Sequence, residues 1–387
     1  MINSTEGLFD FGLNEQQERR AIELHENSIV IDMLFQGPLS PKAIPDQISD
    51  DLKEKCEGFA DDPMTYGRMP SKLISQLAKY GNIPQFKEEW FASGITAGNR
   101  QLNLSDQESM ILSMADVQAQ FDAYDWLVKA RNAEEIRDAK KRNLKAGMIS
   151  AQETDALAKN LELVDALYDF GLRMLQLTYN NQNQIGAGCA EKSNAGLTNF
   201  GIHFIEHLNQ LGVLIDTSHC GKQTTLDACT YSKQPVIASH TGVSNIFNHM
   251  RCKSDEELKA IAATGGVIGV FAMPWFIHDD PNDTSMNHVL DHIDYVVNLV
   301  GVDHVGIGTD WPMSDVTWSL VYFKEHIAPK LGFAKGNGPS TETVKGLEKY
   351  SYFINFTRGL MSRGYSDQDI EKIIGGNWLN VFEEVCG

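Results

Sequence analysis

Residues 213–240 read VLIDTSHCGKQTTLDACTYSKQPVIASH and contain a complete strand–helix–strand unit. The apolar runs at 213–216 and 235–240 are short and rich in β-branched residues, which is typical of strands buried on both faces of a parallel sheet. The segment 222–231 between them predicts a short helix. Each run ends in polar residues and a histidine, at the edge where parallel strands of α/β proteins carry their functional groups. This unit predicts an α/β fold with a site at the carboxyl ends of its strands.

The same alternation of short apolar runs and helical patterns extends through most of the chain. Eight such units predict a (β/α)8 TIM barrel rather than an open doubly wound sheet. Neither GxGxxG nor GxxxxGK[ST] follows any of the runs, so the dinucleotide- and nucleotide-binding folds lose their main sequence signature. The eight strand candidates are 28–32, 94–98, 146–151, 173–179, 213–216, 235–240, 266–271 and 305–310.

The length of 387 residues suits one large barrel with insertions. We expect 1–27 to be an N-terminal helical segment packed on the barrel and 28–387 to be a single barrel domain. Residues 36–84 are rich in Pro, Asp, Lys and Gly and predict an excursion over the surface after the first strand. The segment 105–131 predicts one long helix.

Charge and composition narrow the class of partner and the compartment. The formal net charge is −19, which disfavours nucleic acid and anionic membrane surfaces as partners. The N-terminus lacks the pattern of a secretory signal, and no apolar run approaches the ~18 residues of a membrane span. The six cysteines are scattered without a CxxC pair. We therefore expect a cytoplasmic protein with reduced thiols and a small-molecule substrate.

Three strand ends carry residues that suit a divalent metal. His219 and His240 end two neighbouring strands, and Asp310 ends the last one. Imidazole and carboxylate groups converging from different strands can hold a metal with a water in its open position. Glu153, beside Gln152 after the strand 146–151, is a further carboxylate that can complete such a site.

Several motifs resemble the membrane (renal) dipeptidase family, in order and at compatible spacings from about residue 20 to the C-terminus. The resemblance implies an amidohydrolase-like barrel with a binuclear zinc centre, hydrolysis of dipeptides that include D-residue substrates, and a homodimer. The motifs are LIDTSH (214–219), PVIASHTGVSNIFNHMR (235–251), GGVIGVF (265–271), DHIDYVVNLVGVDHVGIGTD (291–310) and IIGGNWLNVF (373–382).

Four family positions are retained in this chain. The resemblance implies that His219 and His240 hold the second zinc, and that Asp310 is the general base near the nucleophilic water. Arg251 matches the arginine that grips the substrate carboxylate.

Other family positions are changed. The histidine and aspartate of the first zinc fall on Leu34 and Gln36, and the bridging glutamate falls on Gln152. A substrate-contacting histidine has become Tyr179. An aliphatic side chain cannot bind zinc, and without the bridging charge two cations would repel each other strongly. We therefore expect at most one zinc per chain, and the alternative is a barrel that binds no metal.

Three functions follow from these residues. The first is metal-assisted hydrolysis of a dipeptide or related small amide with a carboxylate. The second is a non-hydrolytic reaction in the same pocket, such as dehydration, isomerisation or a biosynthetic tailoring step. The third is a non-catalytic small-molecule-binding protein. The candidate residues are Asp310, His219 and His240 for catalysis, Arg251, Tyr179, Gln152 and Asn180 for substrate binding, and His219, His240, Glu153 and Asp310 for metal.

Overall fold

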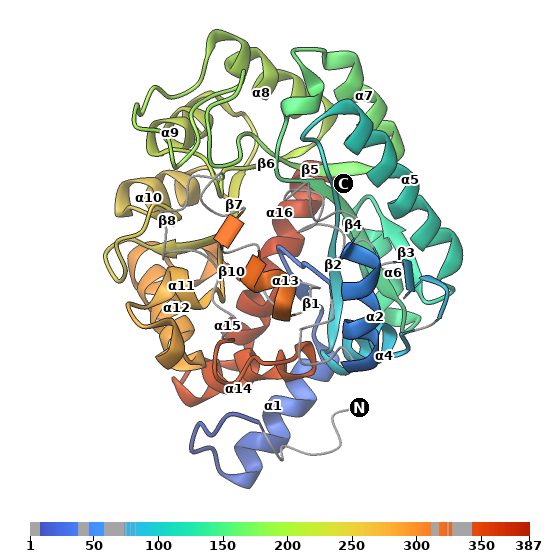
Figure 1. Ribbon diagram of the computed structural model, residues 1–387. Helices are drawn as coiled ribbons and strands as arrows, with labels where there is room; N and C mark the ends of the chain where they lie inside the picture. The colour runs from blue at the N-terminus through green and yellow to red at the C-terminus, as the bar shows by residue number, and fades with distance from the viewer. Residues whose placement is uncertain are drawn as a thin grey trace.

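The computed structural model describes residues 8–37, 46–57, 73, 76, 77, 79–81, 83–310, 317–322, 325, 326 and 343–387. Eight parallel strands run side by side and nearly close into a barrel, with the helices around them (Figure 1). This confirms the predicted fold class, and each of the eight strand candidates contains a strand. In their order around the sheet these are β1 (Val30–Asp32), β2 (Ile95–Leu102), β4 (Lys145–Ala151), β5 (Leu172–Gln176), β6 (Leu214–Asp216), β7 (Val236–Val243), β9 (Ile268–Val270) and β10 (Val305–Ile307).

The seam between the first and last strands is joined by hydrogen bonds just past their carboxyl ends. The backbone N–H of Met33 donates to the Ile307 carbonyl at 2.8 Å, and that of Asp310 donates to the Leu34 carbonyl at 3.1 Å. The buried Asp32 carboxylate accepts the backbone N–H of Thr309 at 2.8 Å and its hydroxyl at 2.6 Å. The Asp32 side chain thus extends the hydrogen bonding between the first and last strands beyond their short paired region.

Met33 fills the barrel interior beneath the carboxyl end. Its sulfur would lie 2.5 Å from a Cβ placed on Gly306 and 3.0 Å from one placed on Gly269. Two neighbouring strands therefore need glycine where this side chain crosses them. The surrounding interior cluster is apolar and includes Ile31, Ala97, Ala146, Met148, Met174, Leu214, Ile237 and Val267.

The outer helices follow the strands as the sequence pattern predicts. At the amino end of the barrel, the side-chain amide of Asn377 donates to the Val305 carbonyl at 2.8 Å and so fixes the last helix there. The carboxyl ends stay available for a site. The helices around and between the strands are α5 (Gln107–Ala123), α6 (Ala133–Lys141), α7 (Leu161–Phe170), α8 (Asn199–Leu211), α9 (Lys222–Tyr231), α10 (Asp255–Ala263), α11 (Pro274–Ile277), α12 (Met286–Val300), α13 (Thr317–Tyr322), α14 (Ile354–Ser362), α15 (Asp367–Glu371) and α16 (Asn377–Cys386).

The predicted long helix over 105–131 is wrong beyond Ala123. Tyr124 leaves the helical conformation and stacks on Trp126, with ring centroids 4.8 Å apart. The chain then forms β3 (Leu127–Ala130), which pairs with β4 outside the main order of the sheet. Burial of these aromatic rings overrides the local helical pattern. A second short strand, β8 (Cys252–Lys253), pairs with β7.

The N-terminal helix α1 (Glu15–Asn27) packs on α14 outside the sheet (Figure 1). Asn14 caps it by accepting the backbone N–H of Gln17, and the guanidinium of Arg358 binds the Glu18 carboxylate at 2.6 Å. The predicted excursion contains α2 (Asp46–Cys56), and α4 (Gln85–Ala92) follows it. Residues 38–45 and 58–72 of that excursion lie outside the described residues. Among the described helices, none is both long and apolar enough to cross a bilayer.

Candidate active site

One buried carboxylate sets the backbone that presents the two histidines. Asp216, the last residue of β6, accepts the backbone N–H and hydroxyl of Ser218 at 3.0 and 2.6 Å. It also accepts the backbone N–H of Ser239 at 2.9 Å and the hydroxyl of that residue. Each serine directly precedes a histidine. The hydroxyl residue before His219 and before His240 is therefore a positioning feature that ties the ends of β6 and β7 together.

The two imidazole rings face each other across the carboxyl end of the barrel. The Nε2 atoms of His219 and His240 lie 2.9 Å apart, and both side chains are buried. The Nδ1 atom of His219 lies 2.7 Å from Asn180 Oδ1, and that of His240 lies 2.8 Å from the Ser239 hydroxyl. Burial, and then the positive charge of Arg251, holds the pKa of both histidines well below the ordinary value, so both rings are neutral.

The outer contacts fix the tautomer of each ring. The Asn180 oxygen can only accept, so the proton of His219 sits on Nδ1. The Ser239 hydroxyl donates its proton to Asp216, so it accepts from Nδ1 of His240. Both Nε2 lone pairs then point at each other, which is repulsive unless a cation or a proton lies between them. Outer hydrogen bonds that leave a second ring nitrogen unprotonated are the usual support of metal-binding histidines.

Asp310 lies near the same nitrogen of His240 that faces His219. Its Oδ2 atom is 4.0 Å from His240 Nε2, and its Oδ1 atom accepts the amide of Gln36 at 2.6 Å. The backbone of Asp310 has φ +53°, a left-handed conformation that is uncommon outside glycine and that is enriched at functional sites. Burial raises the pKa of Asp310 to about 6, and the Gln36 hydrogen bond and the Arg251 charge partly offset this rise. The carboxyl group is therefore mostly ionised at neutral pH.

A row of side-chain amides leads to Asp310 from the strands that follow the seam, β1, β2 and β4. Gln36 follows β1, Gln101 belongs to β2 and Gln152 follows β4. The Gln152 amide donates to the Gln101 oxygen, and the Gln101 amide donates to the Gln36 oxygen at 3.3 Å. We call Gln36, Gln101 and Gln152 the amide row. Sequence reasoning missed Gln101, because nothing in the spacing of β2 distinguishes it from an ordinary polar residue near a strand end.

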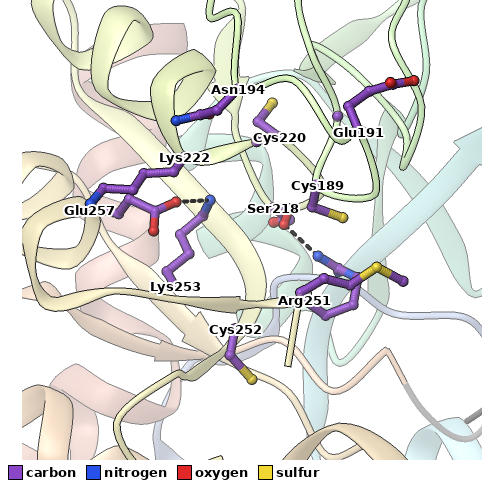
Figure 2. Close-up of a pocket in the computed structure, with 13 residues that line it drawn as sticks. Cys189, Glu191, Asn194, Ser218, Cys220, Lys222, Arg251, Cys252, Lys253 and Glu257 are labelled. Atoms are coloured by element: carbon purple, nitrogen blue, oxygen red, sulfur yellow. Dashed lines mark hydrogen bonds and ion pairs between the residues drawn. The ribbon is translucent and has the colours of Figure 1, made fainter. Parts of the chain in front are cut away.

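Arg251 is buried between the histidines and a neighbouring cavity. Its guanidinium donates to the Ser218 carbonyl at 2.5 Å and lies 3.5 Å from the His240 carbonyl, while its Nε atom has no hydrogen-bond partner. Figure 2 shows Arg251 directed toward Ser218 and Lys253 directed toward Glu257. The cavity has a volume of about 230 Å3. Its wall also includes Cys189, Glu191, Asn194, Cys220, Lys222 and Met250.

The other predicted residues surround this centre in different ways. The Tyr179 ring lies against the ring of His219. Asn180 is fully buried and contacts Nδ1 of His219. Gln152 belongs to the amide row, and Glu153 follows it and is partly buried. Burial raises the pKa of Tyr179, and the charges of Asp310 and Glu153 add to this rise. Direct contact of Tyr179, Asn180 or Gln152 with a substrate stays a prediction, as does metal binding by Glu153.

The donor set fits one divalent ion and does not fit two. His219, His240 and Asp310 offer two imidazoles and a carboxylate, the three protein ligands of many catalytic zinc sites. Within the described ranges no three His, Cys, Asp or Glu side chains are already clustered as a metal site, so Asp310 would have to approach the pair. At the positions implied for a first zinc stand Leu34, Gln36 and Gln152, which carry no charge.

Comparison with known proteins identifies relatives of this chain. The family model described as membrane dipeptidase (peptidase family M19) matches residues 96–321 and 313–386. "Dipeptidase tcpJ" of Claviceps purpurea (strain 20.1) is 26% identical over 242 residues, which are 62% of this chain and 51% of that protein. "Dipeptidase verJ" of Clonostachys rogersoniana is 28% identical over 265 residues, 67% of this chain and 61% of that protein. The chain thus spans about half to three fifths of the length of these relatives.

A solved structure matches over almost the whole length. An amidohydrolase from Pseudomonas aeruginosa superimposes with a TM-score of 0.73 at 26% sequence identity, covering 95% of this chain and 99% of that one. The barrel, the histidine pair and the family match over most of the chain lead to one conclusion: the chain belongs to the membrane dipeptidase family.

Proposed function

We propose that the chain hydrolyses a dipeptide or a related small amide with a free carboxylate, and that it does so with at most one bound metal. The observation that carries this proposal is the pair of Nε2 lone pairs of His219 and His240, which face each other at 2.9 Å. These two residues and Asp310 would hold the ion, which we take to be zinc from the family. When bound, such an ion supplies polarisation of the scissile carbonyl and acidification of water.

Asp310 is the base of the proposed reaction. Its Oδ1 atom accepts from Gln36, so Oδ2 is the oxygen that faces His240. A carboxylate oxygen has two lone pairs, so Oδ2 would contact the ion through one and accept the proton of the attacking water through the other. A carboxyl group with a pKa of about 6 is mostly ionised at pH 7 and is a stronger base than an exposed aspartate. The same group can then return the proton to the leaving amine.

Arg251 holds the substrate carboxylate in this proposal. It is 1% exposed, and no carboxylate among the described residues forms an ion pair with its guanidinium. A buried charge without a counter-ion is costly, and a bound carboxylate would remove that cost. The adjoining cavity gives room for the residue that carries the carboxylate (Figure 2).

A second function, a non-hydrolytic acid–base reaction in the same pocket, is favoured by the amide row. Neutral amides at Gln36 and Gln152 offer hydrogen bonds where charged ligands are implied by the resemblance. In that case His219 and His240 would exchange protons with the substrate directly. Without two metals, plain dipeptides should be poor substrates, and activity should be confined to a narrower class.

Elemental analysis combined with a substrate panel tests the proposal. The protein is purified, its zinc content is measured, and L,L- and L,D-dipeptides are assayed before and after chelation. His240→Asn should abolish both zinc binding and turnover, whereas His203→Asn on the exposed face of α8 should change neither. Dipeptide hydrolysis that survives chelation would contradict the metal-dependent mechanism. No dipeptide turnover at all would favour the non-hydrolytic reaction or a binding protein. Two zinc ions per chain would contradict both the proposed site and the metal count.

A further inference from the structure

The amide row ends on a carboxylate, and this fixes the direction of every hydrogen bond in it. Ionised Asp310 can only accept, so Gln36 must turn its NH2 group toward Oδ1. The Gln36 oxygen then faces Gln101, which must donate to it, and Gln152 must donate to Gln101 in turn. Three aligned amide dipoles therefore point their positive ends at Asp310. The three side chains are partly buried, where hydrogen bonds aligned in this way polarise one another more than in water.

The row is anchored at its far end. The Gln176 side chain is fully buried, and its amide donates to the Gln152 backbone carbonyl and to the Thr178 carbonyl at 2.9 Å. Gln152 is thereby held by its backbone while its own side chain reaches across to Gln101. The row thus follows neighbouring strands around the rim of the barrel, from β5 through β4, β2 and β1 to Asp310 after β10.

We propose that the amide row takes the place of the first metal ion of the family and that Gln36 is a positioning residue for Asp310. The row supplies partial positive charge to Oδ1 without a cation, and it keeps Oδ2 turned toward His240. Gln101 and Gln152 act through Gln36. This inference rests on the proposed function, in which Asp310 serves the histidine pair, and it adds the group that orients Asp310.

Zinc affinity tests the contribution of the amide row independently of catalysis. Zinc alone is titrated into metal-free protein against a chelator for the wild type, Gln36→Leu, Gln101→Leu and the double variant. Loss of an outer hydrogen bond to a metal ligand typically weakens binding about 10–100-fold, and we expect this for Gln36→Leu. Gln101→Leu should have a smaller effect. The double variant should match Gln36→Leu, because Gln101 acts only through it.

Gln118→Leu is the matched control. Gln118, half-buried on the outer helix α5, also donates its amide to a carboxylate, that of Asp122 at 2.8 Å, and accepts from Lys129 at 3.0 Å. Its loss should leave zinc affinity unchanged. If Gln36→Leu fails to fold, Gln101→Leu carries the test alone, since Gln101 does not touch Asp310. Unchanged zinc affinity in a folded Gln36→Leu or Gln101→Leu protein, or additive effects in the double variant, would overturn the inference.

Crystal structures of the wild type and of Gln36→Leu separate this inference from the proposed function. If the wild type binds no zinc, the proposed metal-dependent hydrolysis is wrong. The position of Asp310 in the two crystal structures still tests the role of Gln36. The inference then requires Asp310 to turn away from His240 in the variant, beyond the present 4.0 Å. An Asp310 side chain that keeps its place in the variant would overturn it.

Discussion

The Tyr179 ring stacks on His219 with centroids 4.1 Å apart and planes inclined by 21°. The ring of His219 is thus held on one face by an aromatic side chain and at Nδ1 by Asn180. It can neither rotate nor change tautomer without losing one of these contacts. Where the resemblance implies a substrate-contacting histidine, this chain has a tyrosine that restrains a proposed metal ligand.

Removing the Asn180 contact should loosen that arrangement. In Asn180→Leu, the Nδ1 proton of His219 has no acceptor, and the ring is free to protonate Nε2 instead. We expect zinc affinity to fall about tenfold or more, as for other outer-shell losses. Asn194→Leu, in the wall of the cavity, is the control and should bind zinc like the wild type. Equal affinities for the two variants would contradict the tautomer argument.

In assays with saturating zinc, replacing Asp310 should lower kcat and leave KM nearly unchanged. Asp310→Asn keeps a side chain that tolerates the left-handed backbone at φ +53°, so the protein should fold normally. Loss of a general base typically costs about 10²–10⁴-fold in rate. Steady-state kinetics on the best dipeptide substrate give both constants. A fall of less than threefold in kcat would exclude Asp310 as the base.

The pH profile should show the ionisation of Asp310. Its pKa is raised to about 6 by burial, so the basic form is present above that pH and is lost as pH falls through it. The rate should therefore fall on the acid side, with a midpoint at about 6 or below it if a bound cation favours the carboxylate. Because the folded pKa is raised, this group favours folding most at low pH, and that contribution declines as pH rises through 6. A rate that is flat from pH 5 to 8 would contradict this assignment.

Arg251→Lys should impair recognition of the substrate carboxylate. Lysine keeps the charge but loses the planar fork that binds a carboxylate through two hydrogen bonds. Since a charged hydrogen bond contributes about 1.5–3 kcal/mol, KM should rise roughly 10–100-fold for free dipeptides. The KM of their C-terminal amides should change little. A parallel rise for the amides would indicate that Arg251 serves only to hold the Ser218 and His240 carbonyls.

Restoring charged ligands should restore a second metal. The triple variant Leu34→His, Gln36→Asp, Gln152→Glu replaces three neutral side chains by an imidazole and two carboxylates. We expect two zinc ions per chain by elemental analysis, compared with at most one in the wild type. Leu34 is fully buried, so circular dichroism must first show that the variant is folded. A folded variant with unchanged zinc content would mean that the strand ends differ from the family in more than side-chain chemistry.

The sequence was sufficient for the barrel and for which residues lie at its mouth. Strand ends are set by local patterns, so the β-branched runs before His219, His240 and Asp310 placed all three at one edge of the sheet. Contacts between side chains of strands that are far apart in sequence follow no local sequence pattern. The bond from Gln101 to Gln36 and that from Asn180 to His219 depend on how long side chains turn across the barrel. The sequence pattern did not predict β3 for a similar reason, because the packing of Tyr124 on Trp126 determines where the preceding helix ends.

The seam between β1 and β10 also bears on how the protein is made. The bonds from Thr309 to Asp32 join residues that are 277 positions apart. During synthesis β1 leaves the ribosome long before its partner exists, so its edge stays unpaired until nearly four fifths of the chain has emerged. Contacts of such long range make folding slow. Asp310, the proposed base, follows the strand that closes the barrel, so the proposed site is incomplete until β10 has joined β1.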